Sequence, residues 1–143
     1  MKIAKEFRWE MGHRLPFHEG LCRNIHGHSY KMAVEIIGEV NESGMIIDFY
    51  DLGKVIKPII NEYDHAFLCW ENDKPLLEFL EKQDMKRVIV SYQGTVENIC
   101  NDLISKIYDG LKKLPGYKFQ KLNVKIFETP NSYAENTKDF KVQ

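Results

Sequence analysis

Apolar and polar side chains alternate along residues 3–13 and again along residues 26–37. In the first segment the odd positions are apolar apart from Lys5, and His13 continues the same parity. In the second segment His26 and His28 extend the apolar face, which consists of Tyr30, Met32, Val34 and Ile36. This period of two predicts two strands, each with one buried face.

A helical period follows the second strand. The NESG stretch at 41–44 predicts a turn, and residues 51–63 are apolar at helical spacing. Pro58 lies inside that helix and is expected to kink it or to remove one of its hydrogen bonds. Residues 75–82 are expected to form a short helix, and residues 87–91 a short strand.

The last third of the chain predicts a long helix and a final strand. Thr95 is a candidate N-cap for a strongly amphipathic helix that ends at Leu114-Pro115-Gly116. Residues 122–126 then alternate, and Glu128 shares the parity of the apolar positions. Two strands joined early without a helix between them favour an α+β fold, with an antiparallel sheet and helices on one face.

Composition narrows the function classes. The 143 residues are expected to form one domain, 1–143, with 43% hydrophobic and 29% charged residues. A formal net charge of −1 argues against a broad surface for nucleic acid or membrane. No signal peptide or transmembrane segment is expected, and Cys22, Cys69 and Cys100 do not suggest a disulfide framework. A cytoplasmic protein is therefore expected.

Three histidines form a candidate metal site. His26 and His28 point to the same side of their strand, and His13 meets the start of that strand if the two strands pair as a hairpin. Three neutral imidazoles suit zinc at ~2.0–2.1 Å and leave a fourth position open, as in catalytic sites. Two alternatives stay open: ordinary core histidines, or a closed structural site with Cys22 as fourth ligand. Imidazoles also accept nickel, copper or iron.

Several motifs in order resemble the 6-pyruvoyltetrahydropterin synthase family. They are GHRLPF at 12–17, CRNIHGHSY at 22–30, MIIDF at 45–49, YDHAFL at 63–68, GTVEN at 94–98 and IFETP at 126–130. The similarity runs from Phe7 to about Tyr133. CRNIHGH and ETPNSYA look most like the 6-carboxytetrahydropterin synthase branch, which acts in queuosine (7-deazaguanine) biosynthesis.

The resemblance implies a tunnelling fold, in which a four-stranded antiparallel sheet carries helices on one face. Subunits of the family join their sheets into a barrel, commonly a hexamer of two trimers, with active sites between subunits. The implied reaction converts 7,8-dihydroneopterin triphosphate to 6-carboxy-5,6,7,8-tetrahydropterin, releasing triphosphate and acetaldehyde. The implied cofactor is Zn²⁺, held by His13, His26 and His28.

The family motifs also imply catalytic residues. Cys22 matches the family's cysteine base, and positive charge nearby would favour its thiolate. Asp64 and His65 match a proton-relay pair, which requires the chain to turn at that point because neighbouring strand residues diverge. Cys69 and Cys100 are expected to be structural.

Substrate binding is assigned in the same way. Strand parity turns Glu128 inward, and the resemblance implies that it anchors the pterin, sometimes sharing in the proton relay. Thr95 and Glu97 match a pterin-pocket segment, although both also suit a helix start, and Gly94 and Val96 depart from the family's PTSEN-like pattern. Arg14, Arg23 and Lys31 are candidate triphosphate cations, whereas Asp48 is expected to start a helix or form a turn.

Three other functions remain alternatives. A 6-pyruvoyltetrahydropterin synthase would eliminate only triphosphate at the same site. A non-catalytic protein would use zinc to join two strands, and a metal-independent pterin aldolase of the same fold is disfavoured by the three histidines.

Overall fold

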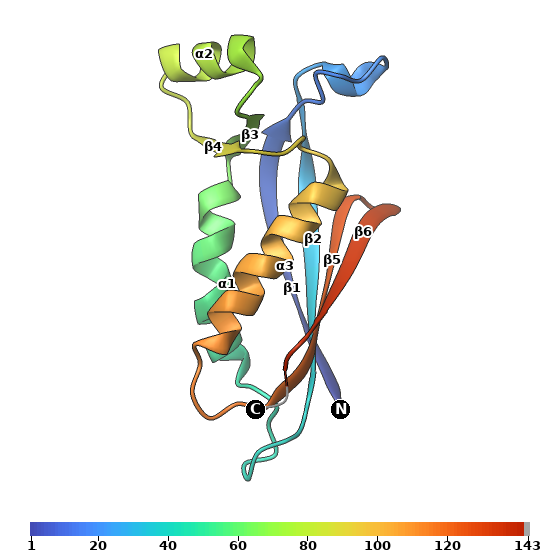
Figure 1. Cartoon of the computed structure of the whole chain (residues 1–143), viewed down its shortest axis with the longest axis vertical. Helices are drawn as coiled ribbons and strands as arrows, with labels where there is room; N and C mark the ends of the chain where they lie inside the picture. Colours follow the sequence, from blue (N-terminus) through green and yellow to red (C-terminus); the bar gives the residue numbers. More distant parts are fainter. Residues whose placement is uncertain (142–143) are drawn as a thin grey trace.

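The computed structural model describes residues 1–141, in which a six-stranded sheet carries helices on one face (Figure 1). The strands follow the order β4-β3-β1-β2-β5-β6 across the sheet. Their bounds are β1 (Lys2–His13), β2 (His26–Gly38), β3 (Ala66–Trp70), β4 (Arg87–Val90), β5 (Phe119–Thr129) and β6 (Ser132–Asp139). The helices are α1 (Phe49–Tyr63), α2 (Lys74–Lys82) and α3 (Val96–Lys112), with a 3-10 turn, η1 (Leu21–Arg23).

Strands β1 and β2 form the long hairpin that the alternating pattern predicts. They pair antiparallel along their whole length, with His13 opposite His26 and Met11 opposite His28. The apolar positions of both strands are buried, from Phe7 to Met11 in β1 and from Tyr30 to Ile36 in β2. The loop that joins the strands is therefore residues 14–25, as expected.

The sheet is larger than expected and mixed in direction. Strands β1, β2, β5 and β6 form consecutive antiparallel pairs, but β3 and β4 extend the β1 edge in parallel. The expectation of a four-stranded, purely antiparallel sheet was therefore wrong in strand number and in direction at this edge. The α+β class and the packing of helices on one face are confirmed.

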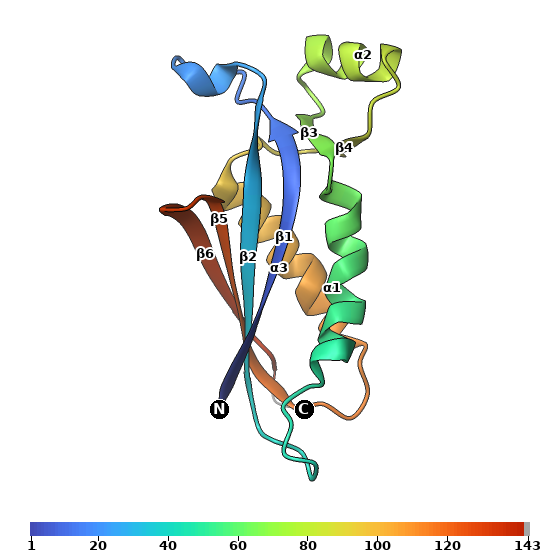
Figure 2. The same cartoon turned by 180° about the vertical axis from the view of Figure 1, so that it is seen from behind.

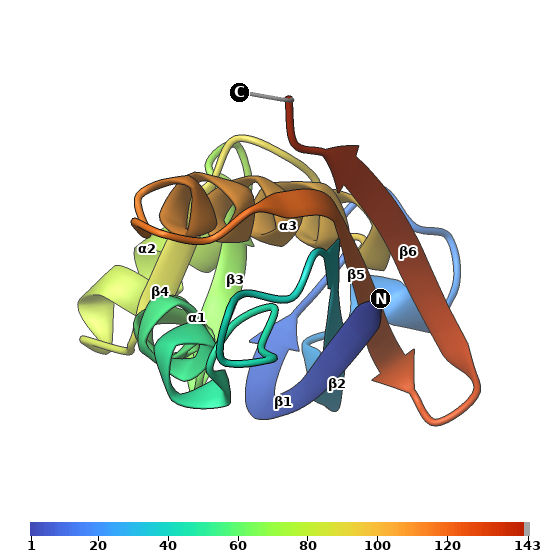
Figure 3. The ribbon, with the colours of Figure 1, turned by 90° about the horizontal axis from the view of Figure 1, so that it is seen from below.

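Helices α1 and α3 lie side by side across one face of the sheet (Figures 2 and 3). The side chain of Asp48 accepts from Tyr50 N at 2.7 Å, and that of Thr95 accepts from Asn98 N at 3.3 Å, so both residues are N-caps. Helix α1 continues through Pro58, whose exposed position lets water satisfy the carbonyl that lost its donor. The core between these helices and the sheet is apolar throughout.

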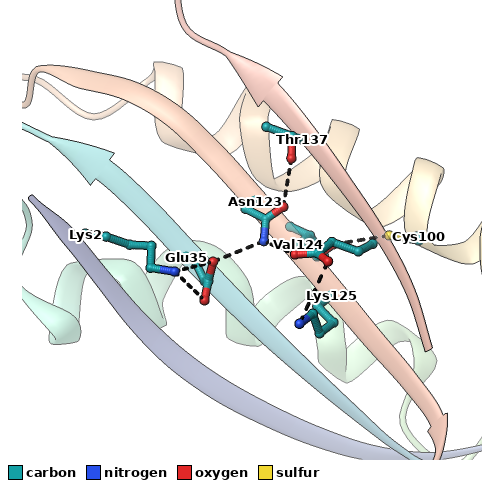
Figure 4. Close-up of polar contacts among 8 residues, drawn as sticks. Lys2, Glu35, Cys100, Asn123, Val124, Lys125 and Thr137 are labelled. Atoms are coloured by element: carbon teal, nitrogen blue, oxygen red, sulfur yellow. Dashed lines mark hydrogen bonds and ion pairs between the residues drawn. The ribbon is translucent and has the colours of Figure 1, made fainter. Parts of the chain in front are cut away.

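The opposite face of the sheet is polar. A chain of hydrogen bonds crosses the four antiparallel strands, from Lys2 through Glu35 and Asn123 to Thr137 (Figure 4). On the helix side Cys100 is buried and its thiol donates to the carbonyl of Val124 at 3.5 Å, which agrees with a structural role. The two faces of the sheet therefore differ sharply in chemistry.

One end of the sheet gathers the functional segments. The end of β1, the start of β2, the loop 14–25, the start of α3 and helix α2 all lie there (Figure 1). Helices of the described residues are too short or too polar to cross a membrane.

Candidate metal and substrate site

The three predicted histidines converge at this end of the sheet. One ring nitrogen from each of His13, His26 and His28 lies within 4.8 Å of the others. The ring centroids are 4.5 Å apart for His13 and His26, 5.1 Å for His13 and His28, and 5.0 Å for His26 and His28. Hairpin register explains this, because His13 and His26 face each other and His28 follows two residues later on the same side.

Backbone carbonyls orient two of the rings. His13 Nδ1 donates to the carbonyl of Gly94 at 2.8 Å, and His26 Nδ1 donates to that of Asn24 at 2.7 Å. A carbonyl oxygen only accepts, so each Nδ1 must carry the proton and each Nε2 keeps its lone pair. Histidines that bind metals show this outer hydrogen bond almost always.

The chemistry of His13 fits a metal ligand. Its Nε2 is buried and has no hydrogen-bond partner among residues 1–141, which is costly for a polar atom. Burial, with a smaller effect from the neighbouring His26 and His28, lowers the pKa of His13 to about 4, although the Gly94 hydrogen bond acts in the opposite direction. Burial also lowers the pKa of His28. Neutral imidazoles with free lone pairs are what a divalent cation requires.

Glu128 reaches the same cluster from β5. Its Oε1 lies 3.4 Å from His13 Nε2 and 3.5 Å from His28 Nε2, so strand parity predicted its direction correctly. The hydroxyl of Tyr30 donates to the same oxygen at 3.4 Å. Burial and the Glu128 charge raise the pKa of Tyr30, which keeps its hydroxyl protonated as a donor. Sequence reasoning placed Tyr30 in the core but missed this polar contact.

Cys22 lies in η1, on the loop between β1 and β2, and is half-buried. Within the described residues its sulfur does not join the three-histidine group. The geometry therefore offers three ligands rather than a closed tetrahedron completed by a thiolate. The remaining cysteines, Cys69 and Cys100, are both buried.

Asp64 and His65 form a pair at the end of α1. His65 has a left-handed φ of 57°, so the chain turns at this residue. Such a turn was the condition for Asp64 and His65 to act together. Asp64 Oδ1 lies 2.9 Å from His65 Nδ1 and also accepts from the backbone of Glu10 at 3.0 Å, and these contacts lower the pKa of Asp64. His65 is exposed and borders a shallow cavity of about 500 Å³ that His28 also lines.

The candidate catalytic residues are only partly in contact with one another in the single chain. Among residues 1–141 no hydrogen bond or ion pair joins the Asp64–His65 pair to Cys22 or to the three imidazoles. Glu128 and the segment at the start of α3 are, by contrast, in contact with the cluster. Within the described residues the three imidazoles and Glu128 therefore form one cluster, and the Asp64–His65 pair shares only a cavity wall with it, through His28.

The segment before α3 lies directly behind His13. A β-carbon on Gly94 would lie 3.3 Å from Leu68 Cδ2 and 3.7 Å from His13 Nδ1, so the residue that departs from the family pattern packs closely here. Thr95 is engaged as the N-cap, and Glu97 is exposed in the first turn of the helix. The capping role is thus observed for Thr95, and its pterin contact stays a prediction.

Two of the three candidate phosphate cations are already paired. Arg14 makes two hydrogen bonds to Asp73, of 2.6 and 2.5 Å, and Lys31 lies 3.6 Å from Glu6 and over the Phe127 ring. Arg23 is exposed in η1. Sequence reasoning did not single out Asp73, because its partner Arg14 lies 59 residues away and no local pattern relates the two.

Comparison with known proteins is consistent with this geometry. The family model described as 6-pyruvoyl tetrahydropterin synthase matches residues 2–139. The 6-carboxy-5,6,7,8-tetrahydropterin synthase of Haemophilus influenzae is 34% identical over 143 residues, covering 94% of this chain and 96% of that one. The enzyme of the same name from Rickettsia bellii is 30% identical over 138 residues, covering 94% and 99%.

Solved structures show the same fold. The crystal structure of 6-pyruvoyl tetrahydropterin synthase from Plasmodium vivax matches with a TM-score of 0.79 at 17% identity, covering 98% of both chains. A protein from Wolinella succinogenes matches with a TM-score of 0.74 at 24% identity, covering 95% of this chain and 97% of that one. From its sequence and its fold, the chain belongs to the 6-pyruvoyl tetrahydropterin synthase family of pterin synthases.

Proposed function

We propose that this chain is a zinc-dependent lyase that converts 7,8-dihydroneopterin triphosphate to 6-carboxy-5,6,7,8-tetrahydropterin, with release of triphosphate and acetaldehyde. The observation that carries the proposal is the convergence of three imidazoles with Glu128, whose Oε1 lies 3.4 and 3.5 Å from two of their nitrogens. Relatives named for the carboxy product support this branch. The step would serve queuosine biosynthesis in the cytoplasm.

The metal would be held by His13, His26 and His28. When bound, a zinc ion would act as a Lewis acid on the oxygens of the substrate side chain and so acidify the neighbouring C–H bonds. The chain prepares this position by fixing the tautomers of His13 and His26 through backbone carbonyls. Burial of His13 also keeps its ring neutral at physiological pH.

The remaining residues would bind the pterin and move protons. Glu128 would accept two hydrogen bonds from the ring N–H and amino group of the pterin, an arrangement that one carboxylate can satisfy. Cys22 as thiolate would remove the proton from the side-chain carbon next to the pterin. Asp64 and His65 would carry that proton onward, and Thr95 and Glu97 would border the pterin pocket.

Among residues 1–141 no hydrogen bond or ion pair joins the Asp64–His65 pair to the histidine cluster of the same chain, and this supports an oligomeric site. We assign the protein a homo-oligomer, a hexamer of two trimers, in which Asp64 and His65 of one subunit serve the histidine cluster of the next. Exposure of His65 in the single chain is consistent with that arrangement. The open edges of β4 and β6 offer backbone groups for joining sheets into a barrel.

Product analysis tests the proposal. The zinc-loaded protein is incubated with 7,8-dihydroneopterin triphosphate, and acetaldehyde and the pterin product are measured by mass spectrometry. Formation of 6-carboxytetrahydropterin with acetaldehyde is expected, and Cys22→Ala should stay folded, keep its zinc and lose turnover. Accumulation of 6-pyruvoyltetrahydropterin without acetaldehyde would identify the pyruvoyl enzyme instead. Unfolding of the chain by chelators alone would indicate a structural zinc.

A further inference from the structure

Asp73 is a buried carboxylate that the proposed reaction does not use. Only 3% of its side chain is exposed, and both of its oxygens are engaged by Arg14, at 2.6 Å by Nε and at 2.5 Å by a terminal nitrogen. The Asp73 carboxylate raises the pKa of Arg14. A bidentate, charge-assisted pair of this kind is among the stronger polar contacts in proteins.

The helix that follows Asp73 does not need this carboxylate. Asp73 occupies the N-cap position of α2, where an aspartate side chain usually accepts from the first turn, but it makes no capping hydrogen bond. The carboxylate is therefore directed away from its own helix and toward the end of β1. Leu76 and Leu80 of α2 form a small apolar cluster with Cys69 of β3, separate from the main core.

The partner of Asp73 lies at the base of the loop that carries Cys22. Arg14 directly follows His13, and the next residue, Leu15, donates its backbone N–H to the carbonyl of Cys22 at 2.8 Å. The other hydrogen bonds of residues 14–25 are local: within the loop, or from the neighbouring His26 to Asn24. In the described part of the chain, Arg14–Asp73 is thus the one polar link between this loop and a distant segment.

We propose that Asp73 is a positioning residue that holds the Cys22 loop in place through Arg14. The carboxylate fixes the guanidinium, the guanidinium fixes the start of the loop, and the Leu15–Cys22 hydrogen bond passes that constraint to the cysteine. Arg14 is accordingly a structural cation, neutralised by its partner, rather than a triphosphate ligand. The catalytic part of this inference rests on the proposed role of Cys22.

Hydrogen exchange tests, without reference to activity, whether the Arg14–Asp73 pair acts as a tether for the loop 14–25. In zinc-loaded, full-length Asp73→Asn, amide exchange in peptides covering residues 14–25 should accelerate ~10-fold or more, because the charge-assisted anchor is lost. Arg14→Lys, which keeps the charge but loses the planar fork, should accelerate the same peptides less. As a matched control, Asp51→Asn removes the 2.6 Å ion pair with Lys54 at the start of α1 and should leave the loop unchanged.

Kinetics tests the link to catalysis. Asp73→Asn should lower kcat ~10-fold or more while KM for 7,8-dihydroneopterin triphosphate stays within ~2-fold and the zinc content is unchanged. Unaltered exchange in the loop of both variants would overturn the tether. A large rise in KM with unaltered exchange would show that Arg14 binds triphosphate and would equally overturn it. If the unsubstituted protein does not turn over this substrate but the variants still show faster loop exchange, the tether is supported and the proposed reaction is refuted.

Discussion

His13 and Gly94 are joined by a 2.8 Å hydrogen bond between ring Nδ1 and backbone carbonyl, across 81 residues of sequence. The bond places the ring proton on Nδ1 and turns the Nε2 lone pair toward the other two imidazoles. It also joins the three-histidine cluster to the segment that begins α3. The candidate metal site and the candidate pterin segment are therefore directly connected, and a shift of one is expected to move the other.

Removal of this ring should remove the metal. His13→Ala is expected to weaken zinc binding by more than ~100-fold, since loss of a ligand exceeds the effect of losing an outer-shell partner. Metal content after dialysis, measured by plasma mass spectrometry, checks this. His18→Ala, which alters an exposed loop histidine, should keep one zinc per chain. Full retention of zinc by His13→Ala would refute the assignment.

The metal-free protein should lose stability on mild acidification. Burial lowers the pKa of His13 from 6.5 in the unfolded chain to about 4 in the fold. Between these two pH values His13 is protonated in the unfolded chain but neutral in the folded chain. The free energy of unfolding therefore falls as the pH falls, and His13 contributes about 3 kcal/mol to this decrease. The lowered pKa of His28 acts in the same direction.

Urea titrations across this pH window measure the effect. Above the pKa of the unfolded chain the contribution is fully present, and below about pH 4 no further loss from His13 is expected. His13→Gln should show a shallower decline than the wild type, whereas His18→Gln should show the same decline. Equal slopes for His13→Gln and wild type would mean that this ring is not held neutral by the fold.

Much of the site followed from the sequence because strand parity and hairpin pairing are local rules. His13, His26 and His28 share one face by alternation, and the loop length brings their strand ends together. Glu128 could be directed inward by the same parity. These are the residues whose placement depends only on regular strands.

The missed elements lack a periodic signal. Strand β6 is polar and half-exposed along its length, so no apolar alternation marks it. Strand β3 is a continuous apolar run, AFLCW, and such a run does not distinguish a strand from a buried helix. The Arg14–Asp73 pair joins residues 59 apart, and no local pattern relates them.

Glu128 should discriminate substrate binding from metal binding. Glu128→Gln keeps the shape but loses the charge, so affinity for the pterin should fall ~10- to 100-fold, as for loss of a charge-assisted bidentate pair. The zinc content should not change, because the three imidazoles are the proposed ligands. Substrate titration and metal analysis on the same preparation check both parts. Loss of zinc together with pterin would make Glu128 a metal ligand.

Subunit complementation can test the shared active site. Cys22→Ala and His65→Ala should each be inactive, because each lacks one member of the proposed proton path. Mixed oligomers formed by co-expression should regain activity, up to about one quarter of the sites if subunits combine at random. Co-expression of Cys22→Ala with Glu128→Gln serves as the control, since both changes affect the same subunit's share of the site. No recovery in the first mixture would argue for sites built within single chains.

The pairing of β1 with β2 has a consequence for how such a protein can vary. Its two strands meet residue for residue from Lys2 opposite Ile37 to His13 opposite His26. Because side chains alternate, a deletion of a single position in either strand would send part of the imidazole set to the polar side of the sheet. Insertions and deletions can accumulate between residues 14 and 25, but the number of residues in each of the two flanking strands must stay constant to keep the register.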